Sequence, residues 1–436
     1  MTATQHNRYH SWRWIPTLFV AEEIPLVLVS YLSLLAFFQL GSSWTSCTIL
    51  SALLMMPWAL KSFFRLKIKQ AGNYRIYLLV CEFLLFIALL SVAMSLSSYS
   101  RTRVIGIFVS FFVVSALSAW HSSLSRMYYE QVLYPREQRL YAGMKRTSSQ
   151  LTMIVAYGLL IMLVGFLEVF FRSFTRAWSM AGYLLAGGML FLLVCNLLLT
   201  KETAVPMPAF ASTVNQSFRN EGQLIGHICR QPHFLRIMSA LFVLLLPFSL
   251  MFYPRVFFLL ALEENGGLGC SLQDVGFAQG TIGVTALMLG GSLGLYFMRH
   301  TSFHRLYFPF VVALTIPSLF YFLMSQYPQP GNMYALCTMT GLTQFCFGIG
   351  LNVCRPFIRY VSCERHRGAA TLLYLPLIVS HTMLPMALSG WLLRSLGIHT
   401  YFILLLLVTL LALCVAYVNR RLLMNVFLSG SAVSAV

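Results

Sequence analysis

The feature that most constrains this chain is a succession of apolar runs, each long enough to cross a lipid bilayer. A hydrocarbon core of about 30 Å is crossed by a helix of roughly 20 apolar residues. The runs lack the alternation of a membrane β-barrel, and helices then satisfy the backbone in lipid. The sequence therefore predicts an all-α, polytopic membrane protein with twelve transmembrane helices. We expect these spans at residues 14–40, 45–63, 76–97, 103–129, 148–168, 177–199, 234–260, 273–298, 306–325, 333–360, 368–393 and 399–418.

Composition and charge agree with a membrane protein. Only 10% of the 436 residues are charged, whereas charged residues make up about a quarter of a soluble domain. The net charge of +18 comes from a one-sided distribution: 24 of the 30 Lys and Arg fall on one side of the expected spans, five on the other, and Arg255 inside a span. The positive-inside rule then predicts a multi-pass protein of the cytoplasmic (inner) membrane with both termini cytoplasmic. The basic residues are expected to contact anionic lipid rather than nucleic acid.

Motifs for other chemistry are missing from the sequence. The ten cysteines form no CxxC pair, and the chain has no phosphate-binding loop or nucleotide motif. The acids, bases and thiols are scattered singly rather than clustered as a catalytic set would be. We therefore expect no cofactor, no metal and no enzymatic activity.

The chain divides into two parts of six spans each. A hydrophilic linker at 200–233 separates an N-terminal half, 1–199, from a C-terminal half, 234–436, which includes a short cytoplasmic tail. Span one and span seven share a Pro and a Tyr at the same spacing, Pro25 with Tyr31 and Pro247 with Tyr253. This pattern favours two parallel six-helix halves with a solute site between them.

The first 75 residues carry a family resemblance. The stretches AEEIPLVLVSYLSLLAFFQLG, MMPWALKSFFR and GNYR resemble the opening of the AmpG-type muropeptide permeases and the related acetyl-CoA and siderophore permeases of the major facilitator superfamily. The residues that carry the resemblance are Pro25, Gly41, Pro57, Trp58, Lys61, Gly72 and Arg75. The resemblance implies the major facilitator fold, alternating access and a peptidoglycan fragment as solute.

Two departures from that family concern charged groups. The loop LKIKQAGNYR lacks the Asp that usually precedes its Gly-Arg turn, and the stretch SAWHSSLSRMYYE of span four has no carboxylate before Glu130. If protons drive this carrier, the acids of the first span are then the expected place for them to bind. This chain resembles a divergent member of the group.

Glu22 and Glu23 are the first candidate site. A carboxylate within a membrane span costs roughly 2.5 to 3.5 kcal/mol on insertion scales, which marks it as functional by default. The two side chains point about 100° apart on a helix, so they cannot share one direction. They either bind a proton or a solute ammonium group, or pair with Lys or Arg near the interface. The nearby Pro25 is expected to kink the helix, and we predict hinges at Pro25, Pro57 and Pro247.

Three arginines are further candidates. Arg255, in the outer half of span seven, either binds an anionic group bidentately or extends to the lipid headgroups. Arg126 is four residues before Glu130 in span four, a spacing that permits an ion pair. Arg355 has the same placement in span ten. Both Arg126 and Arg355 are either site residues or ordinary positive-inside flanks.

His121 and His381 lie inside spans four and eleven. Each either relays protons near neutral pH or is a hydrogen-bonded packing residue. Glu82, in span three, is expected to pair with Arg75 or with a neighbouring helix.

These observations predict a monomeric secondary transporter, coupled to protons, that moves a bulky anionic solute such as a peptidoglycan fragment. Its other partner is the lipid bilayer. A siderophore or an acyl-CoA-like molecule is an alternative solute. A membrane sensor that binds its ligand without transporting it is the alternative from another class.

Overall fold

A computed structural model describes residues 11–61, 73–98, 103–200, 234–354 and 367–421, of which residues 11 and 367–378 are described by their backbone alone. All regular elements in these ranges are helices. Within the described ranges, ten helical segments are long and apolar enough to cross a membrane, and Trp44–Ala59 is a shorter apolar one. In the described residues, each span expected from the sequence overlaps one helix or a succession of helical segments, and the eleventh overlaps α20 (Arg367–Leu396). The prediction of an all-α polytopic membrane protein is confirmed.

The described residues form two compact units. The first takes the described parts of Met1–Leu40 and Leu60–Phe218, and the second those of Gly41–Ala59 and Arg219–Val436. Residues 41–59, which belong to the first half of the sequence, therefore pack with the second unit. The predicted linker, 200–233, lies outside the described residues apart from Thr200.

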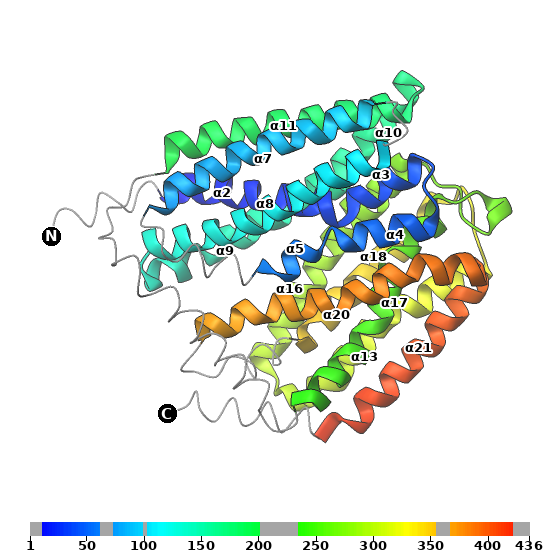
Figure 1. Ribbon diagram of the computed structural model, residues 1–436. Coiled ribbons are helices and arrows are strands. Elements are labelled where there is room, and N and C mark those ends of the chain that lie inside the picture. The colour runs from blue at the N-terminus through cyan, green and yellow to red at the C-terminus, as the bar shows by residue number, and fades with distance from the viewer. Residues whose placement is uncertain (1–10, 62–72, 99–102, 201–233, 355–366, 422–436) are drawn as a thin grey trace. The chain divides into compact units, whose positions relative to one another are not determined.

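The helices of the first unit are α2 (Ser11–Val27), η1 (Leu28–Leu32), α3 (Ser33–Gln39), α7 (Tyr74–Ser97), α8 (Arg103–Val132), α9 (Pro135–Ile154), η2 (Val155–Leu159), α10 (Leu160–Phe171) and α11 (Phe174–Leu199). Helices α7 and α11 lie side by side (Figure 1). Their close approach depends on Gly182, where an added Cβ would stand 2.9 Å from the Cβ of Ala93. Aromatic rings of α2 and α8 fill the core, with the Trp14 and Tyr128 ring centroids 5.2 Å apart.

Span one is not a uniform α-helix. Pro25 has no amide hydrogen to donate to the carbonyl of Ala21, and the five-residue π-helical turn η1 begins three residues later, at Leu28. A second π turn, η2, interrupts the span that continues α9 into α10. The two turns contact each other, because Tyr31 of η1 and Tyr157 of η2 have ring centroids 5.0 Å apart.

The helices of the second unit are α4 (Trp44–Leu53), α5 (Met56–Ala59), α13 (Phe234–Phe252), α14 (Pro254–Leu260), η3 (Glu263–Asn265), α15 (Leu272–Val275), η4 (Gly276–Gly283), α16 (Val284–His300), α17 (Phe303–Gln326), α18 (Met333–Gly350), η5 (Leu351–Cys354), α20 and α21 (Ile398–Val418). Helix α4 packs tightly on α20: the Thr48 hydroxyl donates to the Ala387 carbonyl at 3.0 Å. Gly390 permits this contact, because a Cβ there would lie 2.4 Å from the Trp44 carbonyl oxygen.

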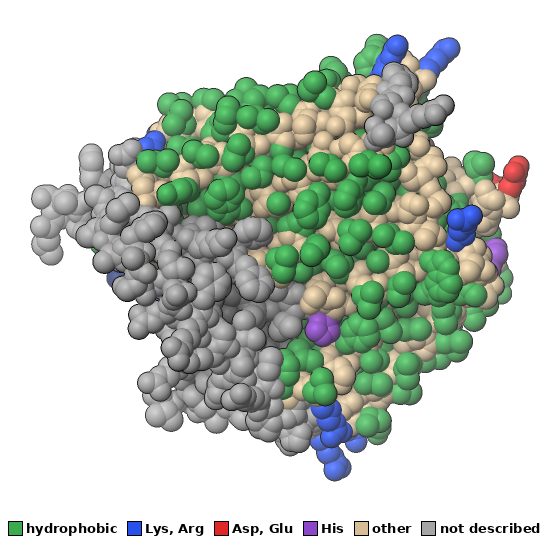
Figure 2. All heavy atoms as spheres, viewed as in Figure 1, with side chains coloured by type: hydrophobic (Ala, Val, Ile, Leu, Met, Phe, Trp, Pro, Cys, Tyr) green, Lys and Arg blue, Asp and Glu red, His purple; other side chains and the backbone are tan. Residues whose placement is uncertain are grey.

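The surface of the helices is apolar. Large hydrophobic side chains are exposed along α7 and α11, among them Phe83, Ile87, Met94, Phe191 and Leu198. Figure 2 shows hydrophobic side chains along the helices on one face, with the visible Lys and Arg near helix ends. Such a surface is stable against lipid rather than water, and the described chain is therefore that of an integral membrane protein.

Candidate functional site

Glu22 is part of a three-residue hydrogen-bonded chain in the first unit. The Ser122 hydroxyl of α8 donates to Glu22 Oε1, and Lys61 Nζ donates to Ser122 Oγ. Ser122 is fully buried, while Glu22 and Lys61 are half-buried. One serine therefore connects a carboxylate of span one to an ammonium group that follows α5.

Glu23 faces a different helix. Its carboxylate interacts with the Ser149 hydroxyl and with the ammonium group of Lys145, both in α9. This difference in direction follows from the 100° between consecutive helical residues and agrees with the expectation from the sequence.

Lys145 has aromatic as well as acidic neighbours. Its ammonium nitrogen lies 4.2 Å from the ring centroid of Phe19 and 5.6 Å from that of Tyr129. It also interacts electrostatically with Glu22 and Glu23. Cation–π contacts of this kind stabilise a cation in a partly desolvated position.

Each glutamate has one oxygen that is not hydrogen-bonded to the described residues. Glu22 Oε2 and Glu23 Oε2 are both buried without a hydrogen-bond partner in that part of the chain. A buried acceptor without a donor costs about 1 to 3 kcal/mol. Binding a proton or a ligand hydrogen at these atoms would remove that cost.

Arg126 forms the ion pair that its spacing predicts. Its Nε lies 2.9 Å from Glu130 Oε1, with 42% of the arginine side chain and 40% of the glutamate side chain exposed. An exposed pair of this kind contributes little to stability. Arg126 also interacts electrostatically with Lys61 and Lys145, which places it at the edge of the same charged group.

Glu82 and His121 are completely buried and contact each other. His121 Nε2 lies 3.1 Å from Glu82 Oε1, and the same oxygen accepts a 2.7 Å hydrogen bond from Asn196 Nδ2. Glu82 thus pairs with neighbouring helices, whereas Arg75 donates to Thr200 and to the Leu197 carbonyl. Of the two alternatives for His121, the structure shows the hydrogen bonds of a packed residue, and proton relay stays a prediction.

Arg255 lies in the second unit and is buried, with 7% of the residue exposed. Its guanidinium carbon is 5.0 Å from the ring centroid of Phe252, and it interacts electrostatically with Tyr321. The Tyr321 hydroxyl accepts a 3.0 Å hydrogen bond from Gln279 of the π turn η4. The burial contradicts the alternative that Arg255 extends to the lipid headgroups.

The remaining candidates have different outcomes. His381, in α20, is half-buried with its ring centroid 5.9 Å from that of Phe242, and a role for it stays a prediction. Arg355 lies outside the described residues.

The three predicted hinge prolines lie at or near helix irregularities. Pro25 and Pro247 lie inside α2 and α13, and Pro57 lies in the short helix α5. Helix α13 ends at Phe252, five residues after Pro247, and α14 starts after Tyr253. The structure thus interrupts each of these spans, and hinge motion stays a prediction.

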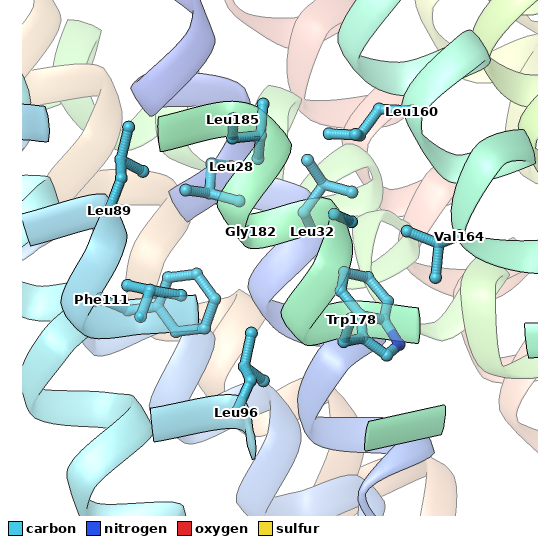
Figure 3. Close-up of a pocket in the computed structure, with 12 residues that line it drawn as sticks. Leu28, Leu32, Leu89, Leu96, Phe111, Leu160, Val164, Trp178, Gly182 and Leu185 are labelled. Carbon is cyan, nitrogen blue, oxygen red and sulfur yellow. The ribbon is translucent and has the colours of Figure 1, made fainter. Parts of the chain in front are cut away.

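An apolar pocket beside the π turn η1 is a poor candidate for a charged solute. Figure 3 shows Leu28 and Leu32 of that turn near Trp178 and Val164. All of its twelve lining residues are apolar or glycine. The pocket offers no side chain that would hold a carboxylate, a phosphate or an ammonium group.

Four residues of the site were not singled out from the sequence as binding residues: Lys61, Ser122, Lys145 and Ser149. Lys61 and Lys145 count toward the positive-inside asymmetry, which explains a lysine near a helix end without any binding role. Serines are common in membrane helices, where they bond their own backbone. Two weaker signals are present in the sequence: Lys61 is one of the residues that carry the family resemblance, and Ser122 lies one helical turn before Arg126 on the same face.

No family model matches the sequence, and no curated protein matches it either. The fold, however, matches solved transporter structures. The structure of tetrameric PepTSo2 matches over 96% of this chain and 99% of its own chain, with a TM-score of 0.70 at 12% identity. The structure of the nucleoside transporter NupG matches over 96% of this chain and 100% of its own chain, with a TM-score of 0.67 at 14% identity. The structure of a D-xylose-proton symporter matches over 93% of this chain and 97% of its own chain, with a TM-score of 0.63 at 12% identity. The chain therefore has the major facilitator fold, as its sequence predicts.

Proposed function

We propose that this chain is a proton-coupled secondary transporter that works by alternating access and carries a bulky anionic solute across the cytoplasmic membrane. The observation that carries the proposal is the hydrogen-bonded chain from Lys61 through Ser122 to Glu22. The fold it shares with solved sugar, nucleoside and peptide transporters supports transport as the activity.

The charges of the site suggest how a proton and an anion are coupled. Within the described residues, Arg126 is already paired with Glu130, so two lysines face the two carboxylates Glu22 and Glu23. When both glutamates are ionised, these charges balance. A proton on Glu22 leaves one positive charge in excess, and a low-dielectric site favours its neutralisation by an anion.

The hydrogen bonds of Ser122 link the proton on Glu22 to the binding of the anion. An ionised Glu22 holds the Ser122 hydroxyl, which in turn accepts from Lys61. Protonation weakens that hydrogen bond, and the Lys61 ammonium group then exchanges its contact with Ser122 for one with a carboxylate or phosphate of the solute. Loss of the proton restores the bridge and favours release of the anion. The solute is thus bound on one side and released on the other as Glu22 gains and loses its proton.

The solute class rests on the family resemblance of the first 75 residues together with these cations. A peptidoglycan fragment carries both carboxylates and sugar rings. We place Arg255 in the second unit as a further anion-binding group, and His121, His381, Arg126 and Arg355 as residues to be tested after it. The transporter is proposed to act as a monomer with both termini in the cytoplasm.

The test is uptake by the purified protein in proteoliposomes. A labelled anhydromuropeptide is offered with an inward proton gradient, without a gradient, and with a protonophore. Uptake that depends on the gradient supports the proposal. Uptake of a ferric siderophore or an acyl-CoA in place of the muropeptide would change the solute and keep the mechanism. Saturable binding with no flux of any of the three would replace transport by a sensor role.

A further inference from the structure

Helices α2 and α8 are joined twice. The first connection is direct, from Ser122 to Glu22. The second runs through two other helices: the Thr17 hydroxyl of α2 donates to Asn196 Oδ1 of α11 at 2.7 Å. Asn196 Nδ2 then donates to Glu82 Oε1 of α7, which contacts His121 of α8. The side chains and the two helix backbones together close a ring.

The two connections lie close together along both helices. Thr17 and Glu22 are five residues apart, about 7.5 Å along the axis of α2. His121 and Ser122 are consecutive, so their side chains leave α8 about 100° apart. One connection therefore holds α8 from the side of α7 and the other from the side of α2. Together they determine how α8 is rotated about its own axis.

Glu82 is the residue on which the second connection converges. Glu82 Oε1 accepts a hydrogen bond from the side-chain amide of Asn196 and contacts the imidazole of His121. All three residues have 0% exposure, so the loss of the acceptor would leave buried donors without a hydrogen-bond partner. Because Ser125 Oγ lies 3.3 Å from His121 Nδ1, the imidazole is held at both nitrogens.

We propose that Glu82 is a positioning residue for the site formed by Glu22, Ser122 and Lys61. By holding α8 through His121 and α2 through Asn196 and Thr17, it brings the Ser122 hydroxyl to Glu22. The inference rests on the proposed function only for the role of Glu22, since the positioning itself is a property of the resting structure.

The test measures the chemical reactivity of the Glu22 carboxyl group, which depends on its hydrogen bond from Ser122, and it requires no transport. Dicyclohexylcarbodiimide is an apolar reagent that modifies carboxyl groups within membranes. Its rate of reaction at Glu22 is followed by peptide mass spectrometry, in protein that carries Glu23→Gln so that only one of the two adjacent carboxyls reacts. Loss of the hydrogen bond from Ser122 to the Glu22 carboxylate should raise that rate about tenfold.

Three kinds of variant separate positioning from other roles. Glu82→Met removes the acceptor and is expected to accelerate the labelling of Glu22. Glu82→Gln keeps an oxygen where Oε1 stands, so it should return the rate toward that of the parent. Thr17→Val cuts the ring at α2 and should act like Glu82→Met, while Thr17→Ser should not. If Glu82→Met does not fold, the comparison of Thr17→Val with Thr17→Ser tests the inference instead.

Ser110→Ala is the matched control. The Ser95 and Ser110 hydroxyls form another hydrogen bond between α7 and α8, at 3.1 Å, outside the ring. The inference is overturned if folded Glu82→Met and Thr17→Val leave the labelling of Glu22 unchanged, or if Ser110→Ala accelerates it equally. A protein without flux that still shows the expected pattern would refute the proposed function and leave the positioning role standing.

Discussion

His121 and Ser122 are neighbours in α8, yet His121 contacts Glu82 of α7 while Ser122 donates to Glu22 of α2. Helix α8 therefore contacts a different glutamate on each of two sides, Glu82 on the side of α7 and Glu22 on the side of α2. A change in the charge of either group acts on the same turn of one helix.

Replacing Ser122 by alanine should uncouple Glu22 from Lys61. The variant removes the hydroxyl that connects them, a hydrogen bond to a charged group worth about 1.5 to 3 kcal/mol. We expect gradient-driven uptake in proteoliposomes to fall about tenfold or more. Ser123→Ala is the control, because the Ser123 hydroxyl donates within its own helix, to the Ala119 carbonyl. Equal losses in both variants would contradict the bridge.

Glu22→Gln should separate driven uptake from exchange. The amide cannot gain and lose a proton, so a gradient has no group to act on, while exchange of internal for external solute needs no net proton movement. We expect driven uptake to disappear and counterflow to persist. Glu168→Gln is the matched control, since Glu168 accepts a hydrogen bond from Gln39 elsewhere in the same unit. Normal driven uptake by Glu22→Gln would rule out Glu22 as the coupling residue.

Gly182→Val should destabilise the first unit, whereas Gly187→Val in the same helix should not. A Cβ at Gly182 meets Ala93 of α7 at 2.9 Å, and one at Gly187 meets nothing within 4 Å. Overpacking typically costs about 1 to 3 kcal/mol. The measurement is the midpoint of thermal unfolding in detergent, which should fall only for Gly182→Val. A similar fall for both variants would argue against the close contact of α7 and α11.

Arg255→Gln should weaken the binding of the anionic solute. The substitution removes a buried charge that lies over the Phe252 ring. We expect KM to rise about tenfold, the effect of losing about 1.4 kcal/mol of a charge-assisted contact. Arg255→Lys keeps the charge without the planar fork and should recover part of the affinity. An unchanged KM in both variants would remove Arg255 from the solute site.

Cys270 should react slowly with maleimides. It lies between α14 and α15, outside the membrane spans, where burial and, to a smaller extent, the Asp274 carboxylate raise the pKa of its thiol to about 11 from an ordinary 9.0. Since the thiolate is the reactive form, the rate should increase about tenfold per pH unit up to about pH 11. Asp274→Asn should lower that pKa and speed the reaction.

The measurement uses a protein whose other nine cysteines are replaced by serine. Labelling of intact cells with an impermeant maleimide also tests the orientation, because the positive-inside rule predicts that this loop lies outside the cell. A plateau in the rate near pH 9 would contradict the raised pKa.

The fold was accessible from the sequence because its main constraint is local. A bilayer requires long apolar helices, and the length and spacing of the apolar runs locate them. Packing is not local in this sense. Nothing in the stretch from Gly41 to Ala59 indicates that α4 packs on α20, since that contact depends on Gly390 and Thr48, which are distant in sequence.

The site was accessible only in part for the same reason. Glu22 and Glu23 stand out because charges are rare within spans, and the pairing of Arg126 with Glu130 follows from the helical period. The partners of Glu22 do not stand out. Ser122 is one of several serines in α8, and Lys61 matches the ordinary distribution of cations at helix ends. Only the folded arrangement of three separate segments brings them together.

The facing π turns η1 and η2 have a consequence for how the first unit can move. A π turn contains one residue more than an α-helical turn would, and that surplus can pass along the helix while each amide exchanges one carbonyl for the next. Passing it by one position rotates the displaced residue by about 100° without separating the helix ends. Ser30, whose hydroxyl lies 3.4 Å from that of Tyr157, would then leave that phenol and face another neighbour. A span can in this way change the side chains it presents while its length in the membrane stays the same.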